Sequence, residues 1–132
     1  MQAALAGEHA CVYGYGVIGA NLGGDEQAAA RRARQAHEAQ RDALHDHVLA
    51  LDAAPEAALP AYALPFDVDD AASARELAAT LEERLAAVYV DLVAAGPEDD
   101  LRAFAAETLI DVAVEHTRWT GSTTAFPGLE NR

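Results

Sequence analysis

Residues 2–22 combine a helical rhythm of apolar side chains with one acid placed inside that rhythm. The row that recurs at spacings of three and four consists of Leu5, Glu8, Val12, Tyr15, Gly19 and Leu22. Such spacing is typical of a helix packed lengthwise against other helices. Because an unpaired buried charge costs several kcal/mol, the acid needs a cation, a metal or a proton beside it. The pattern predicts a helical bundle with Glu8 near its axis.

Three further stretches of the chain lack helix breakers and have the same rhythm. The predicted helices cover about residues 2–22, 25–53, 71–95 and 98–119, and a tail follows over 120–132. A chain of 132 residues usually forms one domain, so residues 1–132 are expected to be a single, all-α, four-helix domain. Phe126 and Leu129 are expected to pack the tail against the helices.

Residues 54–68 contain three prolines, at positions 55, 60 and 65. Each proline removes a backbone donor and restricts the residue before it, which excludes a helix here. We expect a long crossover that lies over the bundle and is anchored by Tyr62, Leu64 and Phe66. Its length allows the third helix to start at the same end of the bundle as the second.

Charge and cysteine content exclude several functional classes. The formal net charge is −13, from 22 acidic residues against nine basic ones, and all nine are Arg. An acidic chain without a basic face is a poor partner for nucleic acid. The single cysteine, Cys11, excludes an intrachain disulfide and a Cys-based zinc site. No apolar run reaches the ~20 residues of a membrane span and no basic leader precedes an apolar core, so we expect a cytoplasmic protein with no membrane partner.

Polar residues interrupt the inward-facing rows of the later helices as well: His37 and Arg41 lie on the row of the second helix, and Glu115 lies on that of the fourth. In di-iron four-helix proteins, two helices each supply one Glu and the other two each supply Glu-x-x-His, because positions i and i+3 share a helix face. Glu8 and Glu82 match the single acids. The two paired motifs read Glu38-x-x-Arg41 and Glu115-x-x-Arg118. Arg has no lone pair to offer a metal, so both positions expected to be imidazole have lost that capacity.

We therefore expect a buried ion-pair centre in place of a metal pair. Its predicted members are Glu8, Arg41, Glu82, Arg118 and Glu115, and which acid meets which Arg stays open. The alternative is an iron or manganese site formed by Glu8, His37, Glu38, Glu82, Glu115 and His116. Adjacent helical residues point about 100° apart, so only one member of each neighbouring His/Glu pair could face inward.

Residues 14–19 read Gly-Tyr-Gly-Val-Ile-Gly, which matches the G-x-G-x-x-G motif of dinucleotide-binding sites. That motif needs a preceding strand and a second strand about 20 residues on. The downstream residues are helical in pattern, so no such unit can be drawn. We therefore interpret the glycines of this motif as small residues that let two helices approach closely.

The order of several short motifs resembles a known family. They are GEHACVYGYGVIGANL, AHEAQRDAL, AYALPFDV, the Arg-Trp pair at 118–119 and the terminal AFPGL. Together they resemble the ferritin-like superfamily and, within it, a bacterial ferritin-like family catalogued as domain of unknown function 4439. The resemblance covers nearly the whole chain. It implies a ferritin-like four-helix bundle and no established activity, and it supplies no catalytic residues.

The sequence favours a non-enzymatic structural or interaction module with a degenerate di-iron site and no cofactor. A homodimer is expected, because ferritin-like bundles commonly pair through their first two helices. The competing hypothesis is an iron- or manganese-dependent redox or storage protein. A third is a protein that binds a small apolar ligand between its helices, in a cavity near Trp119.

Overall fold

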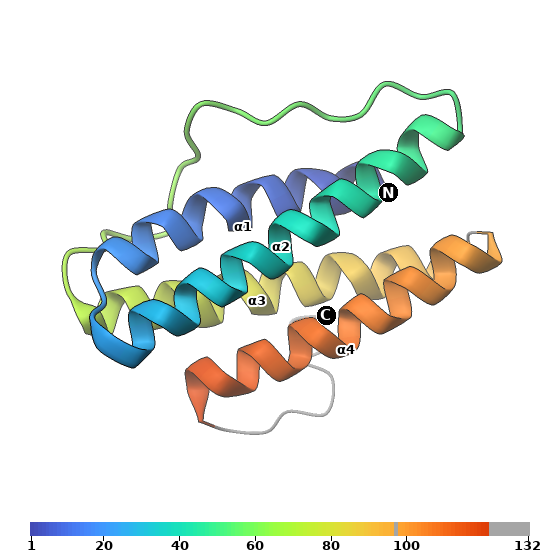
Figure 1. Cartoon of the computed structure of the whole chain (residues 1–132). Coiled ribbons are helices and arrows are strands. Elements are labelled where there is room, and N and C mark those ends of the chain that lie inside the picture. The colour runs from blue at the N-terminus through green and yellow to red at the C-terminus, as the bar shows by residue number, and fades with distance from the viewer. Residues whose placement is uncertain (97, 122–132) are drawn as a thin grey trace.

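The computed structural model describes residues 1–96 and 98–121, which form an all-α four-helix bundle (Figure 1). The helices are α1 (Gln2–Ala20), α2 (Gly24–Ala50), α3 (Ala71–Ala94) and α4 (Asp99–Thr120). The predicted all-α fold is therefore confirmed, although α1 and α2 end two and three residues earlier than expected. The contacts predicted for Phe126 and Leu129 lie outside the described residues.

Local chemistry explains where the helices begin and end. Asp70 precedes α3 and accepts a hydrogen bond from the backbone N–H of Ser73 at 2.7 Å, while the Ser73 hydroxyl accepts one from the backbone of Asp70 at 3.2 Å. This reciprocal capping box satisfies donors that the first turn leaves free. Gly121 ends α4 with a φ of 68°, a left-handed conformation that favours glycine.

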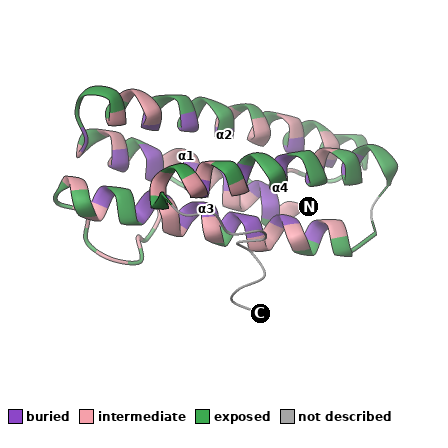
Figure 2. Ribbon diagram, turned by 90° about the horizontal axis from the view of Figure 1, so that it is seen from below, coloured by how far each residue is buried: buried purple, intermediate pink, exposed green. Residues whose placement is uncertain are grey.

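The helices form a bundle with three well-packed sides and one open side. α1 packs against both α2 and α3, and α4 packs against α3, whereas α2 and α4 touch only slightly. Figure 1 shows α2 and α3 running in one direction and α1 and α4 in the other. Figure 2 shows buried residues along the facing sides of the helices and exposed residues on their outer sides.

The predicted crossover connects α2 to α3 along α1 (Figure 1). The ring of Tyr62 lies 5.7 Å from that of Tyr13, and the side chain of Gln2 donates to the carbonyl of Ala54 at 2.7 Å. Leu64 and Phe66 pack partly buried against the core. As a result α3 begins at the end of the bundle where α2 begins, as the length of this segment predicted.

Two glycines of α1 allow its close approach to α3. A Cβ atom on Gly7 would lie 2.9 Å from Leu85, and one on Gly14 would overlap the side chain of Leu81. The backbone of α1 therefore packs directly against leucine side chains. A single helix runs through the whole G-x-G-x-x-G motif, which confirms a packing role at Gly14 and rules out the strand that a dinucleotide site requires.

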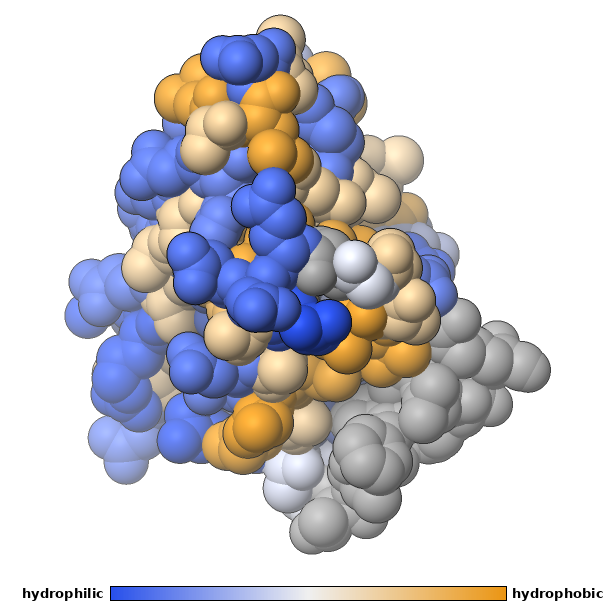
Figure 3. Space-filling view, turned by 90° about the vertical axis from the view of Figure 1, so that its right-hand side faces the viewer, coloured by the Kyte–Doolittle hydropathy of each residue, from blue (hydrophilic) through white to orange (hydrophobic). Residues whose placement is uncertain are grey.

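The surface carries both hydrophilic and hydrophobic areas. Figure 3 shows hydrophilic residues over much of one end of the bundle, with hydrophobic residues gathered in separate areas. The large hydrophobic side chains that are most exposed are those of Leu49, Leu51, Leu59, Ile110 and Val114. Among the described residues, none of the helices has the length and apolar character needed to span a bilayer.

Candidate functional site

Three charged side chains from three helices meet inside the bundle. Glu8 comes from α1, His37 from α2 and Glu82 from α3, and their exposed fractions are 0%, 2% and 0%. The Nδ1 atom of His37 lies 2.7 Å from Oε2 of Glu8, and its Nε2 atom lies 2.5 Å from Oε1 of Glu82. When both carboxylates are ionised they only accept hydrogen bonds, so both ring nitrogens donate and His37 is an imidazolium. We call this arrangement the Glu8–His37–Glu82 bridge.

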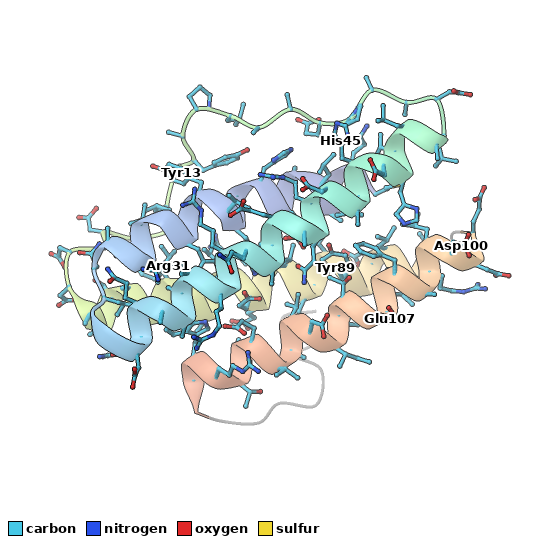
Figure 4. All side chains as sticks on the ribbon, viewed as in Figure 1. Tyr13, Arg31, His45, Tyr89, Asp100 and Glu107 are labelled. Atoms are coloured by element: carbon cyan, nitrogen blue, oxygen red, sulfur yellow. The ribbon has the colours of Figure 1, made fainter. Side chains whose placement is uncertain are left out.

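Two tyrosines complete the bridge. The hydroxyl of Tyr89 donates to Oε1 of Glu8 at 2.7 Å, and the hydroxyl of Tyr15 donates to Oε1 of Glu82 at 2.8 Å. The Tyr15 ring also stacks on His37, with centroids 5.4 Å apart. In Figure 4, Tyr89 points into the bundle, while Tyr13 points towards the crossover. Three of the four carboxylate oxygens are thereby satisfied, and Oε2 of Glu82 has no partner among the described residues.

The electrostatics of the bridge favour a proton on His37. Burial by itself would lower the pKa of His37, but the charge of Glu82 and the hydrogen bonds to both carboxylates outweigh it and raise the pKa to about 10. Burial raises the pKa of Glu8, although His37 and Tyr89 oppose that shift. Burial and the nearby carboxylates also raise the pKa values of Tyr15 and Tyr89, so both phenols stay protonated as donors. The bridge is therefore a pair of acids sharing one internal cation.

The prediction that Arg41 and Arg118 neutralise the buried acids is wrong in its geometry. Arg41 donates to Asp42 at 3.0 Å, and Arg118 donates to Glu115 at 3.0 Å within the same helix. The side chain of Arg118 is 69% exposed and that of Arg41 is 29% exposed. A long guanidinium side chain can lay its carbons along the helix and keep its charge in water. The compact imidazole of His37 lies one turn before Arg41 and meets the acids instead.

The residues of the alternative metal site lie partly inside and partly outside the bridge. Glu8, His37 and Glu82 converge, but Glu38 lies near the surface with Arg34 3.9 Å away. The carboxylate of Glu115 is occupied by Arg118 and by the indole N–H of Trp119, and His116 is buried with its Nδ1 atom unpaired among the described residues.

The observed arrangement does not fit a metal ion. A metal ligand must offer a lone pair, and both ring nitrogens of His37 are already engaged in short contacts with carboxylate oxygens, at 2.7 and 2.5 Å. Within residues 1–96 and 98–121, no group of three or more His, Cys, Asp or Glu side chains has the geometry of a metal site.

Sequence reasoning missed the role of His37 as the internal cation. It placed His37 on the inward-facing row of the second helix, yet assigned the positive charge to arginine because arginine is permanently charged. Spacing could not distinguish the two residues, because both lie on the predicted row; only the structure shows that His37 belongs to the buried residues of α2 and that Arg41 does not.

A cleft opens beside the bridge, between α2 and α4. It consists of two adjoining hollows of about 630 and 220 Å³, which share Ala33, Ala36, Glu115 and Arg118. The larger hollow extends past Trp119 to the start of α2, and the smaller one reaches His37, Gln40 and Glu82. We call the two hollows together the α2–α4 cleft. An enclosed cavity near Trp119 was the test of the third hypothesis, and the structure has instead an open cleft there, whose walls carry charged as well as apolar side chains.

Comparison with known proteins defines a family and a fold. The model of one protein family, described as a domain of unknown function (DUF4439), matches residues 1–131. The chain is also similar to the crystal structure of a conserved hypothetical protein, rv2844, from Mycobacterium tuberculosis. The two chains share 32% sequence identity, the match covers 91% of each, and the TM-score is 0.88. No curated protein matches.

Proposed function

The chain belongs to the DUF4439 family, and within it we propose that this protein is a non-enzymatic structural or interaction module. In this proposal the bundle is ferritin-like, and the Glu8–His37–Glu82 bridge takes the place of a di-metal centre. The observation that supports it most strongly is that one imidazolium joins two fully buried carboxylates from different helices.

The bridge has the properties of an internal crosslink. It ties α1, α2 and α3 together through charge-assisted hydrogen bonds, which are shorter and stronger than neutral ones. A metal pair would hold helices together in the same region through coordination bonds. A protonated histidine supplies one positive charge from within the chain, so part of the charge of the two buried acids is balanced without a metal.

Metal analysis separates this proposal from the iron or manganese hypothesis. Protein purified without chelators should carry substoichiometric iron and manganese, and an excess of either ion should leave its melting temperature unchanged, because a ligand that binds the native state raises it. Stoichiometric metal that is lost in a Glu82→Gln variant and kept in a Glu107→Gln variant would establish the competing hypothesis. Glu107 is an exposed residue of α4 and serves as the control (Figure 4).

A homodimer and a cytoplasmic location remain part of the proposal. The crossover covers part of α1, so the apolar side chains available for pairing include Ile110 and Val114, which are 64% and 46% exposed and lie one turn apart on α4. Light scattering after size exclusion tests the dimer. An Ile110→Glu variant should dissociate it if this face carries the contact, whereas a change to glutamate at Ala39, exposed on α2, should not.

A further inference from the structure

The inner wall of the α2–α4 cleft contains an acid, Glu82, whose hydrogen-bonding capacity is incomplete. Oε2 of Glu82 is buried and has no partner among the described residues, although Oε1 of the same carboxylate accepts from both His37 and Tyr15. The amide oxygen of Gln40 is also buried and unpartnered in that part of the chain. Both residues line the smaller hollow. Buried polar atoms normally have partners, so two unpaired acceptors on one hollow indicate a missing donor.

We propose that the α2–α4 cleft binds a small organic cation, with an ammonium group donating to Glu82 and Gln40 and an apolar body lying against Trp119. An ammonium group carries several N–H donors and no acceptor, which matches a carboxylate oxygen and an amide oxygen. The proposal goes beyond the structural role of the bridge, because it assigns a ligand to the space beside it.

The charges around the cleft favour a cation over an anion. The acids that line the cleft outnumber the cations: they are Asp25, Glu26, Glu82, Asp111 and Glu115, against Arg32, Arg75, Arg118 and His37. Arg118 is paired with Glu115 and Arg75 with Glu26, so these two cations are already neutralised. His37 is shared between two carboxylates, which leaves one negative charge in excess when both are ionised. The chain as a whole has a net charge of −13, which attracts cations and repels anions at long range.

The larger hollow offers an apolar surface for the rest of the ligand. Ala29, Ala33 and Ala36 line it from α2, and Trp119 lines it from α4. The indole N–H is used by Glu115, so the ring is held in place by a hydrogen bond of 3.1 Å. Aromatic rings attract cations as well as apolar groups. A ligand with an ammonium head and a body of a few carbon atoms therefore fits both hollows.

Trp119 is the single tryptophan of the chain, so its fluorescence reports directly on the cleft. The probes are benzylamine, benzyl alcohol and benzoate, which share a shape and differ in charge at neutral pH. Benzylamine should change the fluorescence saturably, and at least about tenfold more tightly than benzyl alcohol, because hydrogen bonds to a charged group are the stronger ones. Benzoate should not saturate.

Matched variants locate the bound ammonium group. Gln40→Leu should weaken benzylamine binding roughly tenfold, whereas Gln35→Leu on the exposed side of the same helix should leave it unchanged. Glu82→Gln should abolish the preference for benzylamine over benzyl alcohol. If Glu82→Gln does not fold, benzylamine binding by Gln40→Leu tests the proposal by itself. Equal responses to the three probes, a response that never saturates because the cleft holds only water, or unaltered binding in Gln40→Leu would each overturn the proposal.

Discussion

The unfolding free energy of this protein should fall as the pH rises from about 6.5 to about 8.5. The pKa of His37 is raised from 6.5 to about 10 in the folded protein by the carboxylates of Glu8 and Glu82. A group whose pKa is raised by folding contributes stability that is complete below its unfolded pKa and is lost as the pH rises through its folded pKa. The raised pKa of Glu8 likewise makes stability fall with rising pH, over a window that begins at its ordinary value of 4.5.

The structure sets the size of this effect. Between the unfolded and folded pKa values of His37, stability should fall by up to about 1.4 kcal/mol per pH unit, hence by roughly 2 kcal/mol over this window. The window ends below the ordinary thiol pKa of 9.0, so the Cys11 thiol does not contribute. Urea denaturation at several pH values, followed by circular dichroism, measures the slope.

Two variants complete this experiment. His45→Asn changes an exposed histidine of α2 and should retain the slope, while His37→Asn should lose about 3–5 kcal/mol at neutral pH, because it strands two buried carboxylates. A stability that is constant or increases between pH 6.5 and 8.5, together with a His37→Asn variant as stable as His45→Asn, would refute the assignment of His37 as an imidazolium.

Three further predictions test the packing around the bridge. Tyr89→Phe should lower the unfolding free energy by about 1–3 kcal/mol, because it removes a donor from a buried carboxylate. Tyr13→Phe should lower it by less than about 0.5 kcal/mol, and chemical denaturation of both variants measures the difference. Gly14→Ala should lower the melting temperature by overpacking, while Gly16→Ala should raise it through helix propensity, and the opposite order would contradict the close approach of α1 to α3. Arg41→Leu should change the unfolding free energy by less than about 0.5 kcal/mol; a loss of several kcal/mol would restore Arg41 as a partner of the buried acids.

The sequence predicts the architecture well because each helix repeats its signal many times. The rows of α1 and α3 predicted Glu8 and Glu82 at inward-facing positions, and both carboxylates are fully buried. The row of α2 likewise predicted His37 in the interior. Periodicity predicts these positions because the helix backbone fixes the side to which each Cβ atom points, and a short side chain on the inner side stays buried.

The partner of each buried acid could not be read from the same rows. Arg41 lies one turn after His37 on the predicted row, so spacing alone predicts a buried position for both residues. The difference arises from side-chain length, since Arg41 can reach water and bind Asp42 whereas His37 cannot. The tyrosine donors were hidden for a related reason. Tyr15 and Tyr89 appear in sequence as ordinary core aromatics, and only the relative placement of α1 and α3 directs their hydroxyls to the acids.

The close packing of one side of the bundle is linked to the opening of another. Glycines at positions 7 and 14 bring α1 against α3, and the bridge then pulls α2 towards both of them. α4 contacts α3 along its length and is left with little contact to α2. The second oxygen of Glu82 has no partner among the described residues, and Glu82 lines the smaller hollow of the cleft. The same carboxylate thus belongs to the internal ion pair and to the cleft wall, so the ammonium ligand that we propose would act directly on that ion pair.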